Sequence, residues 1–515
     1  SGDQSERLAA IIDSIENWSD GWATSTVTER GSHVGFVGTD ETPDAVVDLA
    51  VDAIIPRAKE DLQRDFGSFT EKRPFTGLVK ANPRKALSAL SVAARTKDYP
   101  QVFWSAMINE LPDDIAPRLR RVFLHRLGRL PLTVIVELRH TVCRWLEQNI
   151  TKLIEFDDEL AWAVFDHVVD GVVGGGDNAT ESGIGKVSRG GEFIPQSRRT
   201  YQHAINGPLG MCAEALFHAV PGEKQEQNSL IPDHIKTRIE RLFASPGEGS
   251  DHAVSITFSK LNWLMYVDPE WGEHRLVPML AFDHPAAEPA WNGFLCSSRV
   301  PWSPLAVLVK PFLLQAVPWV ENQIWDRDLA KVITQWLGWM YIFKRDEDDG
   351  LTKQEMRRVL REMSDDTRNQ FIWWLGQVGQ GNDDGWETLV APFLDEVWPR
   401  ERIYRTASSV DSWISMLDDT GPSFPVVYAS AKRFLVPVDS DHHPFYRFTR
   451  EVGEDEPITA QFPAETLDLL DTVTPQVLSR IPYELPKILA LVSESSPDLR
   501  ADHRYLRLID LVEGI

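Results

Sequence analysis

The stretch from residue 252 to 295 carries an amphipathic pattern that stops at a tight break and restarts at once. Its first apolar residues are spaced by four, three and four positions: Val254, Phe258, Leu261 and Met265. That spacing predicts a helix that buries one face. Asp268 and Pro269 then predict a second helix start, because aspartate accepts a backbone N–H bond at a helix cap and proline fits the first turn. With an aromatic-rich loop expected over 290–294, we interpret the stretch as a helical hairpin of a packed array.

The same helical periodicity recurs along the rest of the chain. Predicted helices cover residues 7–18, 43–66, 83–96, 101–111, 160–173, 207–220, 234–243, 304–320, 328–343, 352–363, 366–378, 386–398, 410–417, 464–470, 475–485 and 500–511. Extended segments are expected at 32–40 and 424–437. Without sustained strand alternation, the pattern indicates an all-α chain. Because 515 residues exceed what one core usually holds, and no clean fixed repeat emerges, the expected fold is an irregular α-solenoid of stacked helical hairpins, HEAT/armadillo-like.

The predicted domain organisation has four parts. Residues 1–170 form an N-terminal helical array with a basic segment at 118–144, and residues 171–206 form a Gly-rich insertion loop. Residues 207–440 form a central helical array, and residues 441–515 form C-terminal capping helices. The 18 tryptophans fit this organisation, because buried aromatic side chains supply large contact areas between helices without one large core.

Composition limits the classes of function. The formal charge of −24 opposes non-specific binding to nucleic acid, which depends on clustered Lys and Arg. The 3 cysteines lie far apart, which excludes a disulfide scaffold and a Cys-based zinc site and fits a reducing cytoplasm. No membrane span is expected, because the most apolar run, 304–320, is interrupted by Lys310 and by prolines. The start at Ser1-Gly2 resembles the remnant of a cleaved tag, which indicates a fragment of a longer protein, and whether an enzyme domain precedes Ser1 stays open.

The segment from 117 to 149 changes character, because its many arginines face only Glu137 and Glu147 as acids. Two interpretations stay open. The arginines form a solvated helix face that pairs with acidic neighbours. Alternatively, they form an interface for an acidic partner or a nucleotide tail, where arginine makes bidentate pairs. Under the second interpretation the candidate binding residues are Arg118, Arg121, Arg126 and Arg129.

The most Gly-dense stretch, 171–191, matches a phosphate-binding loop poorly. Such a loop needs G-x-x-x-x-G-K-[ST] between a strand and a helix, and here Thr180 and Val187 occupy two of the required positions. We therefore expect a mobile insertion loop. Further candidate partner-binding residues in this loop and in two tryptophan-containing loops are Lys186, Arg189, Trp291 and Trp302.

The best local cluster for a metal combines carboxylates with imidazoles: Asp439, Asp441, His442 and His443. Adjacent residues rarely face one ion, and Pro444 indicates an exposed turn, so a helix-entry loop is the competing interpretation. The acid–histidine pairs at 251–252, 273–274 and 283–284 lack a metal-binding spacing and are expected to be surface or cap residues. No motif in the sequence demands a nucleophile, so we expect no catalytic residue and no cofactor in this chain.

Several short segments of the chain and its closing stretch resemble those of a known family. In chain order they are Trp263-Leu264, Asp268-Pro269-Glu270-Trp271, Arg275-Leu276-Val277-Pro278, residues 291–295, Val397-Trp398-Pro399-Arg400, His443-Pro444, Phe462-Pro463-Ala464 and the closing stretch 498–513. In these residues the chain resembles the helical C-terminal region of bacterial defence-associated sirtuin proteins. The resemblance implies that a separate N-terminal sirtuin-type domain hydrolyses NAD, while the helical region senses a phage-encoded protein or holds the assembly inactive. The start of this sequence has no Gly-Ala-Gly-type strand turn, so the NAD cofactor does not carry over to it.

The leading hypothesis is a non-catalytic, cytoplasmic sensor or regulatory region of an anti-phage defence protein. It is expected to bind a phage-encoded or regulatory protein and to control an NAD-hydrolysing effector domain of the full-length protein. Nucleic acid and membrane are not expected partners, and homo-oligomer formation stays open. Two alternatives stay open as well. One is a metal- or nucleotide-dependent enzyme, with the nucleotide near Lys186, and the other is an architectural oligomerisation scaffold.

Overall fold

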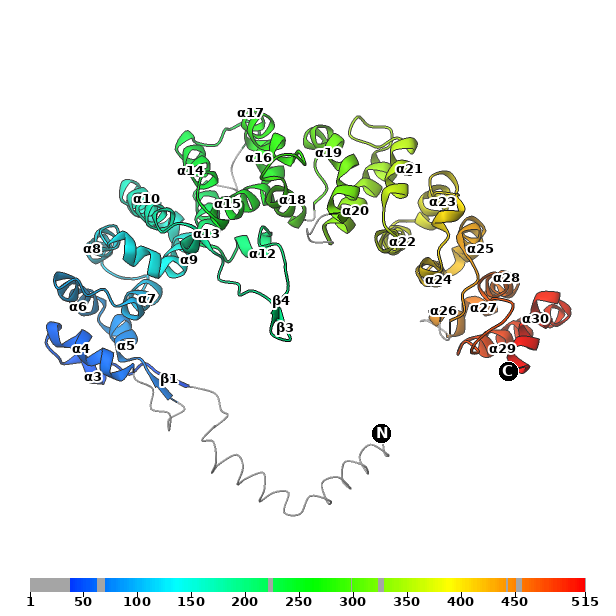
Figure 1. The fold of residues 1–515 in the computed structure, drawn as a ribbon, viewed down its shortest axis with the longest axis horizontal. Helices are drawn as coiled ribbons and strands as arrows, with labels where there is room; N and C mark the ends of the chain where they lie inside the picture. The colour runs from blue at the N-terminus through cyan, green and yellow to red at the C-terminus, as the bar shows by residue number, and fades with distance from the viewer. Residues whose placement is uncertain are drawn as a thin grey trace, which may run out of the picture. The chain divides into compact units, whose positions relative to one another are not determined.

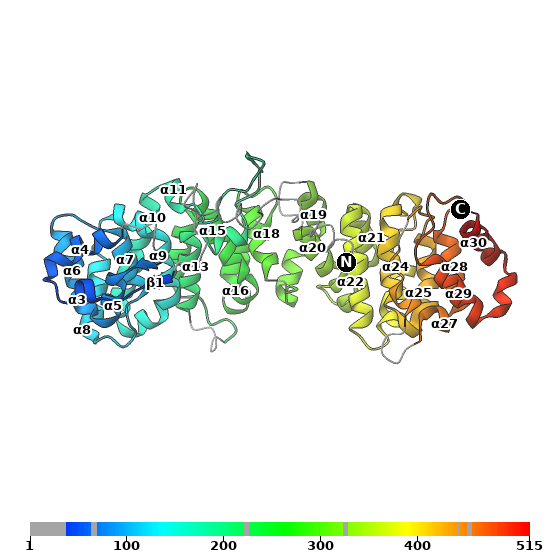
Figure 2. The same cartoon turned by 90° about the horizontal axis from the view of Figure 1, so that it is seen from below.

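The computed structural model describes residues 38–62, 70–220, 226–297, 299–322, 328–440, 443–450 and 456–514. These residues are helical almost throughout, and they form the predicted all-α helical-repeat array (Figures 1 and 2). In the described ranges the strands are limited to two short pairs. The chain divides into two compact units, Ser1–Trp145 with Lys152–Gly171, and Leu146–Thr151 with Val172–Ile515.

The first unit is a stack of helices that pack mainly on their neighbours in the sequence. Its elements are β1 (Gly38–Asp40), α3 (Asp44–Val47), α4 (Val51–Asp61), β2 (Thr70–Lys72), α5 (Pro74–Ala81), α6 (Pro83–Arg95), α7 (Gln101–Asn109), α8 (Pro117–Leu127) and most of α9 (Leu132–Phe156) and α10 (Asp158–Gly174). Helix α6 packs against α4 and α5, and α7 packs against α5 and α6. Strands β1 and β2 pair in parallel, with Gly38 opposite Thr70.

The second unit, taken by itself, is also built from packed helices. Its elements are α11 (Asp177–Thr180), β3 (Ser188–Arg189), β4 (Glu192–Phe193), α12 (Tyr201–Ala204), α13 (Pro208–His218), α14 (Asp233–Phe243), α15 (Glu248–Ser259), α16 (Leu261–Val267), α17 (Pro269–Trp271), α18 (Ala287–Cys296), α19 (Ser303–Asn322), α20 (Asp328–Lys344), α21 (Lys353–Glu362), α22 (Asp365–Gln380), α23 (Ala391–Glu396), α24 (Val410–Asp418), α25 (Phe424–Ala431), α26 (Tyr446–Thr449), α27 (Ile458–Gln461), α28 (Pro463–Val473), α29 (Leu485–Ser495) and α30 (His503–Glu513). Strands β3 and β4 form an antiparallel hairpin, with Ser188 opposite Phe193. The last three helices pack on one another (Figure 2).

Buried aromatic side chains connect successive helices of the second unit. The rings of Trp398 and Trp413 meet edge to face with centroids 4.8 Å apart, and Trp413 stacks on Phe434 at 5.5 Å. All three side chains are buried. Aromatic pairs of this kind add about 0.5–1.5 kcal/mol beyond the area that they bury. Tryptophan therefore serves inter-helix packing, as its abundance in the sequence predicted.

The predicted break at Asp268 is confirmed. Its carboxylate caps α17 by accepting the backbone N–H of Trp271 at 3.2 Å. It also accepts the backbone N–H of Ile231 at 3.0 Å and pairs with the Lys236 ammonium at 2.5 Å. Because Asp268 is buried, these partners replace the water that a carboxylate otherwise needs. Asp268 therefore links the start of α17 to Ile231, just before α14, and to Lys236, within α14.

The second half of the 252–295 stretch needs a correction. After α17 the chain forms a π-helical turn, Gly272–Leu276, and then a 3₁₀ turn, Val277–Leu280. The loop expected over 290–294 is wrong, because these residues lie within α18 and are buried. Helix α18 packs so closely on α15 that a Cβ atom on Gly293 would lie 1.9 Å from the carbonyl oxygen of Ser255. Glycine at that position allows the close approach.

Two segments near the C-terminus differ from the prediction. The stretch expected to be extended, 424–437, contains α25 and a 3₁₀ turn, Lys432–Phe434. The buried residues of α25 recur at helical spacing: Phe424, Val427, Tyr428 and Ala431. The expected helix at 475–485 is wrong, because α29 begins only at Leu485, after a segment that contains Pro475 and Pro482. The predicted helix at 7–18 and most of the expected extended segment 32–40 lie outside the described residues.

Helix α19 corrects the expectation that no membrane-span candidate exists. Among the described residues, the segment Ser303–Glu321 is long and apolar enough to cross a membrane by length and composition. Lys310 and the prolines do not interrupt it, since α19 continues through Pro311 and Pro318. It packs against α20 and α21, and Lys310 donates to the Gly350 carbonyl oxygen at 2.7 Å. These contacts are those of a helix in the array.

Candidate functional site

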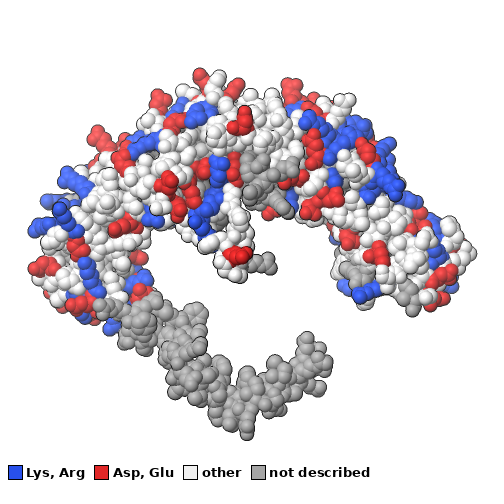
Figure 3. All heavy atoms as spheres, in the orientation of Figure 1, with Lys and Arg blue, Asp and Glu red and all other residues white. Residues whose placement is uncertain are grey.

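A groove lined by basic side chains lies between α6 and α8 in the first unit. Its volume is about 560 Å³, within the range of sites that bury a small ligand or several side chains. Two arginines from each helix line it: Arg84, Arg95, Arg118 and Arg126. No acidic residue is among the residues that line it. Figure 3 shows basic side chains gathered over α8.

Helix α6 supplies one wall because of its amphipathic pattern. Asn82 caps the helix by accepting the backbone N–H of Lys85 at 3.1 Å, and Pro83 occupies the first turn. The inward face buries Ala86, Leu87, Ala89 and Leu90. Side chains spaced by four, three and four residues therefore share the groove wall: Arg84, Ser88, Ser91 and Arg95.

Helix α8 supplies the other wall in the same way. It begins at Pro117, and it buries Phe123, Leu124 and Leu127 toward the array. The groove side of α8 carries residues spaced by four: Arg118, Val122 and Arg126. Leu119 adds an apolar surface, and the side chain of Val122 is 41% exposed. The groove thus combines an apolar floor with cationic rims.

The four groove arginines make no ion pair with any residue that the structure describes. Arg121, on a different face of α8, behaves otherwise: it pairs with Asp157 at 3.2 Å and lies over the Phe156 ring. That contact is the pairing expected of a solvated face. Arg129 is exposed and does not line the groove. Of the four predicted arginines, the structure therefore brings Arg118 and Arg126 together.

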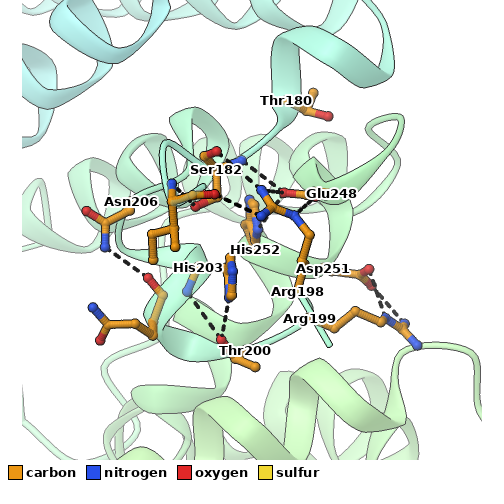
Figure 4. A network of polar contacts seen from close by, with 12 residues as sticks. Thr180, Ser182, Arg198, Arg199, Thr200, His203, Asn206, Glu248, Asp251 and His252 are labelled. Atoms are coloured by element: carbon orange, nitrogen blue, oxygen red, sulfur yellow. Dashed lines mark hydrogen bonds and ion pairs between the residues drawn. The ribbon is translucent and has the colours of Figure 1, made fainter. Parts of the chain in front are cut away.

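The predicted insertion loop at 171–206 is anchored at its base (Figure 4). Its ends are helical, since residues 171–174 complete α10 and the loop also contains α11 and α12. Arg198 pairs with Glu248 of α15 and donates to the Ile184 carbonyl oxygen at 2.8 Å. Burial opposes ionisation of Glu248, but the hydrogen bond from Arg198 keeps the pKa of that carboxyl below its usual range. The segment is therefore fixed to α15 by a charge-assisted pair.

Arg199 forms a second anchor beside the first. Its guanidinium donates to both carboxylate oxygens of Asp251, at 2.8 and 2.9 Å, which is a bidentate pair. It also lies 3.5 Å from Glu288 of α18 and donates to the Pro285 carbonyl oxygen at 2.5 Å. The two adjacent arginines thus tie one loop to two helices.

His252 lies beneath these ion pairs and is fully buried. Its Nε2 atom is 3.6 Å from Glu248, and neither ring nitrogen makes a well-aligned hydrogen bond with a described residue. Burial lowers the pKa of His252 to about 4, although Glu248 and Asp251 oppose that shift. A Cβ atom on Gly207 would lie 2.2 Å from Nδ1, so the backbone at Gly207 covers the ring. The expectation of a surface or cap residue at 252 is wrong.

Lys186 lies beside the hairpin that forms the outer part of this loop. Lys186 is exposed, and the side chain of Arg189 lies outside the described parts of the structure. Phe193 in β4 is 71% exposed, and Val187 and Ile194 are exposed as well. The hairpin therefore presents apolar side chains together with Lys186. Gly190 and Gly191 form its turn with positive φ values of 62° and 88°, which glycine adopts readily.

Comparison with known proteins reveals one distant similarity. The chain is 21% identical over 323 residues to the uncharacterized protein y4cA of Sinorhizobium fredii, strain NBRC 101917 / NGR234. The match covers 60% of this chain and 26% of that protein, so the chain spans about a quarter of the length of this relative. No family model and no solved structure matches the chain.

The two candidate tryptophans are packed into the array. Trp291 lies in α18, is fully buried, and donates its ring N–H to the Leu280 carbonyl oxygen at 2.9 Å. It is not available to a partner, so this prediction is wrong. The error followed from expecting a loop where the chain is helical. Trp302 is half-buried and meets the Tyr266 ring edge to face at 5.9 Å.

The candidate metal residues make separate contacts where they are described. Asp439 accepts hydrogen bonds from Ser479, whereas the Nδ1 atom of His443 lies 2.7 Å from Asp411. Asp441 and His442 lie outside the described residues. Among the residues that the structure does describe, no group of three acidic, histidine or cysteine side chains is placed to hold a metal ion.

Four arginines of these sites were not predicted from the sequence: Arg84 and Arg95 in the groove, and the anchoring residues Arg198 and Arg199. Arg84 and Arg95 lie on α6, far from the basic segment, and nothing in the sequence places α6 beside α8. The adjacent pair Arg198-Arg199 was visible, but its acidic partners lie about 50 residues away. Opposite charges at that separation give no local pattern to recognise.

Proposed function

We propose that this chain is a recognition region that binds an acidic protein partner through the groove between α6 and α8. The observation that carries this proposal is the set of four arginines in that groove, whose lining includes no acidic residue and which make no ion pair among the described residues. Guanidinium groups that have no anionic partner in the free chain gain charge pairs when a partner with carboxylates binds. Arginine suits the role, because its guanidinium forms bidentate pairs with carboxylates.

An acidic protein segment fits the whole chain better than nucleic acid does. The formal charge of −24 repels a long polyphosphate beyond the groove. A short acidic segment has a limited number of charges, which the groove can match. Helical arrays generally use extended surfaces made by stacked helices to bind proteins. The groove is such a surface.

We further propose that partner binding regulates an effector domain. The resemblance to the helical region of defence-associated sirtuin proteins supports a phage-encoded partner and an NAD-hydrolysing effector. The Sinorhizobium fredii relative is consistent with this proposal, since the matched region is 26% of a longer polypeptide there. On this proposal the chain itself contributes recognition, and its cytoplasmic location follows that of the phage proteins it senses.

The proposal is tested by reversing single charges in the full-length protein. We expect Arg118→Glu and Arg126→Glu each to weaken capture of phage-encoded proteins from infected cells about tenfold, because the loss of one close charge pair costs about 1.4 kcal/mol or more. Quantitative mass spectrometry of affinity-purified protein measures the capture. The same cells report whether NAD is consumed during infection.

Arg129→Glu is the matched control. Arg129 lies two residues after the end of α8, is exposed, and does not line the groove. Its substitution by glutamate changes the net charge by the same amount as the two groove substitutions. Capture should survive this substitution. If all three variants capture phage proteins as well as the parent does, the groove is not the recognition site. If the parent captures no phage protein under conditions in which it protects cells, the sensor function is wrong.

A further inference from the structure

The groove between α6 and α8 has a defined length and charge pattern. Arg84 and Arg95 are separated by 11 residues on α6, which corresponds to about 16 Å along a helix. Arg118 and Arg126 are separated by 8 residues on α8, or about 12 Å. The arginines therefore mark the ends of the groove on both walls. The space between them is occupied by apolar and hydroxyl side chains.

The floor of the groove discriminates between possible backbone conformations of a bound peptide. Leu87, Val92, Leu119 and Val122 supply apolar surface. The two hydroxyl groups there are already used within α6, since Ser88 donates to the Arg84 carbonyl oxygen and Ser91 to that of Leu87, each at 2.8 Å. The hydroxyl oxygens keep lone pairs, so an extended peptide would find only these two side-chain acceptors on the floor for its backbone N–H groups. A helix satisfies its own backbone and needs only side-chain contacts.

We propose that the occupant of this groove is an acidic amphipathic helix of about three turns, which belongs to the protein partner. Its apolar side chains lie on Leu119 and Val122, and its carboxylates pair with the arginines at both ends. Carboxylates placed at positions i and i+11 match the spacing of Arg84 and Arg95 on α6. This inference rests on the proposed function, because it names the partner segment that the same groove binds.

Charge complementarity favours this occupant over others. Four arginines in a groove whose lining includes no acidic residue favour an occupant with several negative charges, and the apolar floor residues favour an apolar side chain between those charges. A free polyphosphate supplies the charges but leaves the floor uncovered. Nucleic acid also lacks a stacking partner, since no aromatic residue is among those that line the groove. A second copy of this chain would bring a further charge of −24, and that charge opposes association.

A displayed peptide library tests the inference against the full-length protein. One library fixes glutamate at i and i+11 and varies the apolar residues at i+4 and i+7 between them. A second library replaces the glutamates by glutamine, and a third adds a central proline that breaks the helix. We expect groove-dependent binders from the first library only. Selected peptides, measured by fluorescence anisotropy, should lose about tenfold or more in affinity for Arg118→Glu and for Arg84→Gln/Arg95→Gln.

Controls separate folding from binding and one proposal from the other. Arg129→Glu should bind the selected peptides as the parent does, and the melting temperature of each variant shows whether it folds. Equal recovery from the proline library would overturn the helical conformation, and equal recovery from the glutamine library would overturn the charge pairing. Recovery of no groove-dependent peptide, while phage-protein capture still depends on Arg118, would reject the helix and leave the proposed function standing. Groove-dependent binding of inorganic polyphosphate in place of peptides would reject both.

Discussion

At the scale of single residues, His252 shows how the array holds a titratable group in its neutral form. The side chains that act on its charge are Glu248, Asp251, His203 and, through Glu248, Arg198. Burial has the largest effect and lowers the pKa to about 4. In the unfolded chain the imidazole has its ordinary pKa of 6.5. Between these two values the unfolded state binds more protons than the folded state, so acidification favours unfolding.

We predict that His252→Gln removes part of the pH dependence of stability. The contribution of neutral His252 is fully present above pH 6.5 and is lost as pH falls toward 4. The difference between the unfolded and folded pKa values of His252 corresponds to about 3 kcal/mol in the free energy of unfolding, at 1.36 kcal/mol per pKa unit. Urea unfolding followed by circular dichroism at several pH values measures it. Between neutral pH and pH 4, the free energy of unfolding of the parent should fall by about 3 kcal/mol more than that of the variant.

The comparison has to be made as a difference between parent and variant. Burial raises the pKa of Asp418 to about 7, and this group acts in the opposite direction, because its folded form retains a proton that the unfolded chain loses. The two contributions offset one another in the parent between pH 4 and 6.5. Since Asp418 is present in both proteins, it cancels in the difference. Parallel profiles for parent and variant would show that His252 titrates normally in the fold.

At the scale of elements, close helix contacts depend on small residues at particular positions. Helix α18 meets α15 at Gly293, where an added Cβ atom would lie 1.9 Å from a backbone oxygen. The neighbour is backbone, so it cannot rotate away as a side chain does. We predict that Gly293→Ala destabilises the protein by about 1–3 kcal/mol, the range typical of overpacked cores. Urea unfolding measures the loss.

Gly174→Ala is the matched control for that prediction. Gly174 ends α10, and a Cβ atom added there meets nothing within 4 Å. Alanine also favours the helix over glycine, so this substitution should stabilise the protein by about 0.5–1 kcal/mol. Equal destabilisation by both substitutions would mean that the α15–α18 contact is not the cause.

The sequence predicted the start of a helix correctly where a capping residue determines that start. Thr352 and Glu355 form a capping box at the start of α21, where a helix was predicted to begin, and Asp268 caps α17. The prediction failed at α25, where the prolines at 425 and 437 favoured an extended segment over 424–437. Burial of residues at helical spacing outweighed that preference, because tertiary packing overrides intrinsic propensity. Such packing is not visible before the neighbouring helices are known.

The candidate site was predictable only in part for a related reason. Arg118 and Arg126 stood out, since they form a basic run in an acidic chain. Which arginines of that run would be neutralised depended on tertiary contacts, as the pair between Arg121 and Asp157 illustrates. Arg84 and Arg95 on α6 complete the groove, and their relation to α8 arises only from the fold.

At the scale of the whole molecule, the contacts of each helix are mainly local in sequence. Helix α6 packs on α4, α5 and α7, and α30 packs on α28 and α29. In an array of this kind, stability is approximately a sum of terms from each helical unit and its neighbours. A defect in one part should therefore loosen its surroundings and leave distant helices protected.

We predict that Leu90→Ala and Leu508→Ala produce separate patterns of amide hydrogen exchange. Both leucines are fully buried, and each truncation leaves a cavity that costs about 2–5 kcal/mol. Leu90→Ala should accelerate exchange in α4, α5 and α7 without changing α28 and α29, and Leu508→Ala should do the reverse. Hydrogen exchange with mass spectrometry resolves the two ends of the chain. Acceleration along the entire chain by either substitution would instead indicate a single cooperative unit, in which a partner bound at α6 and α8 would stabilise every helix equally.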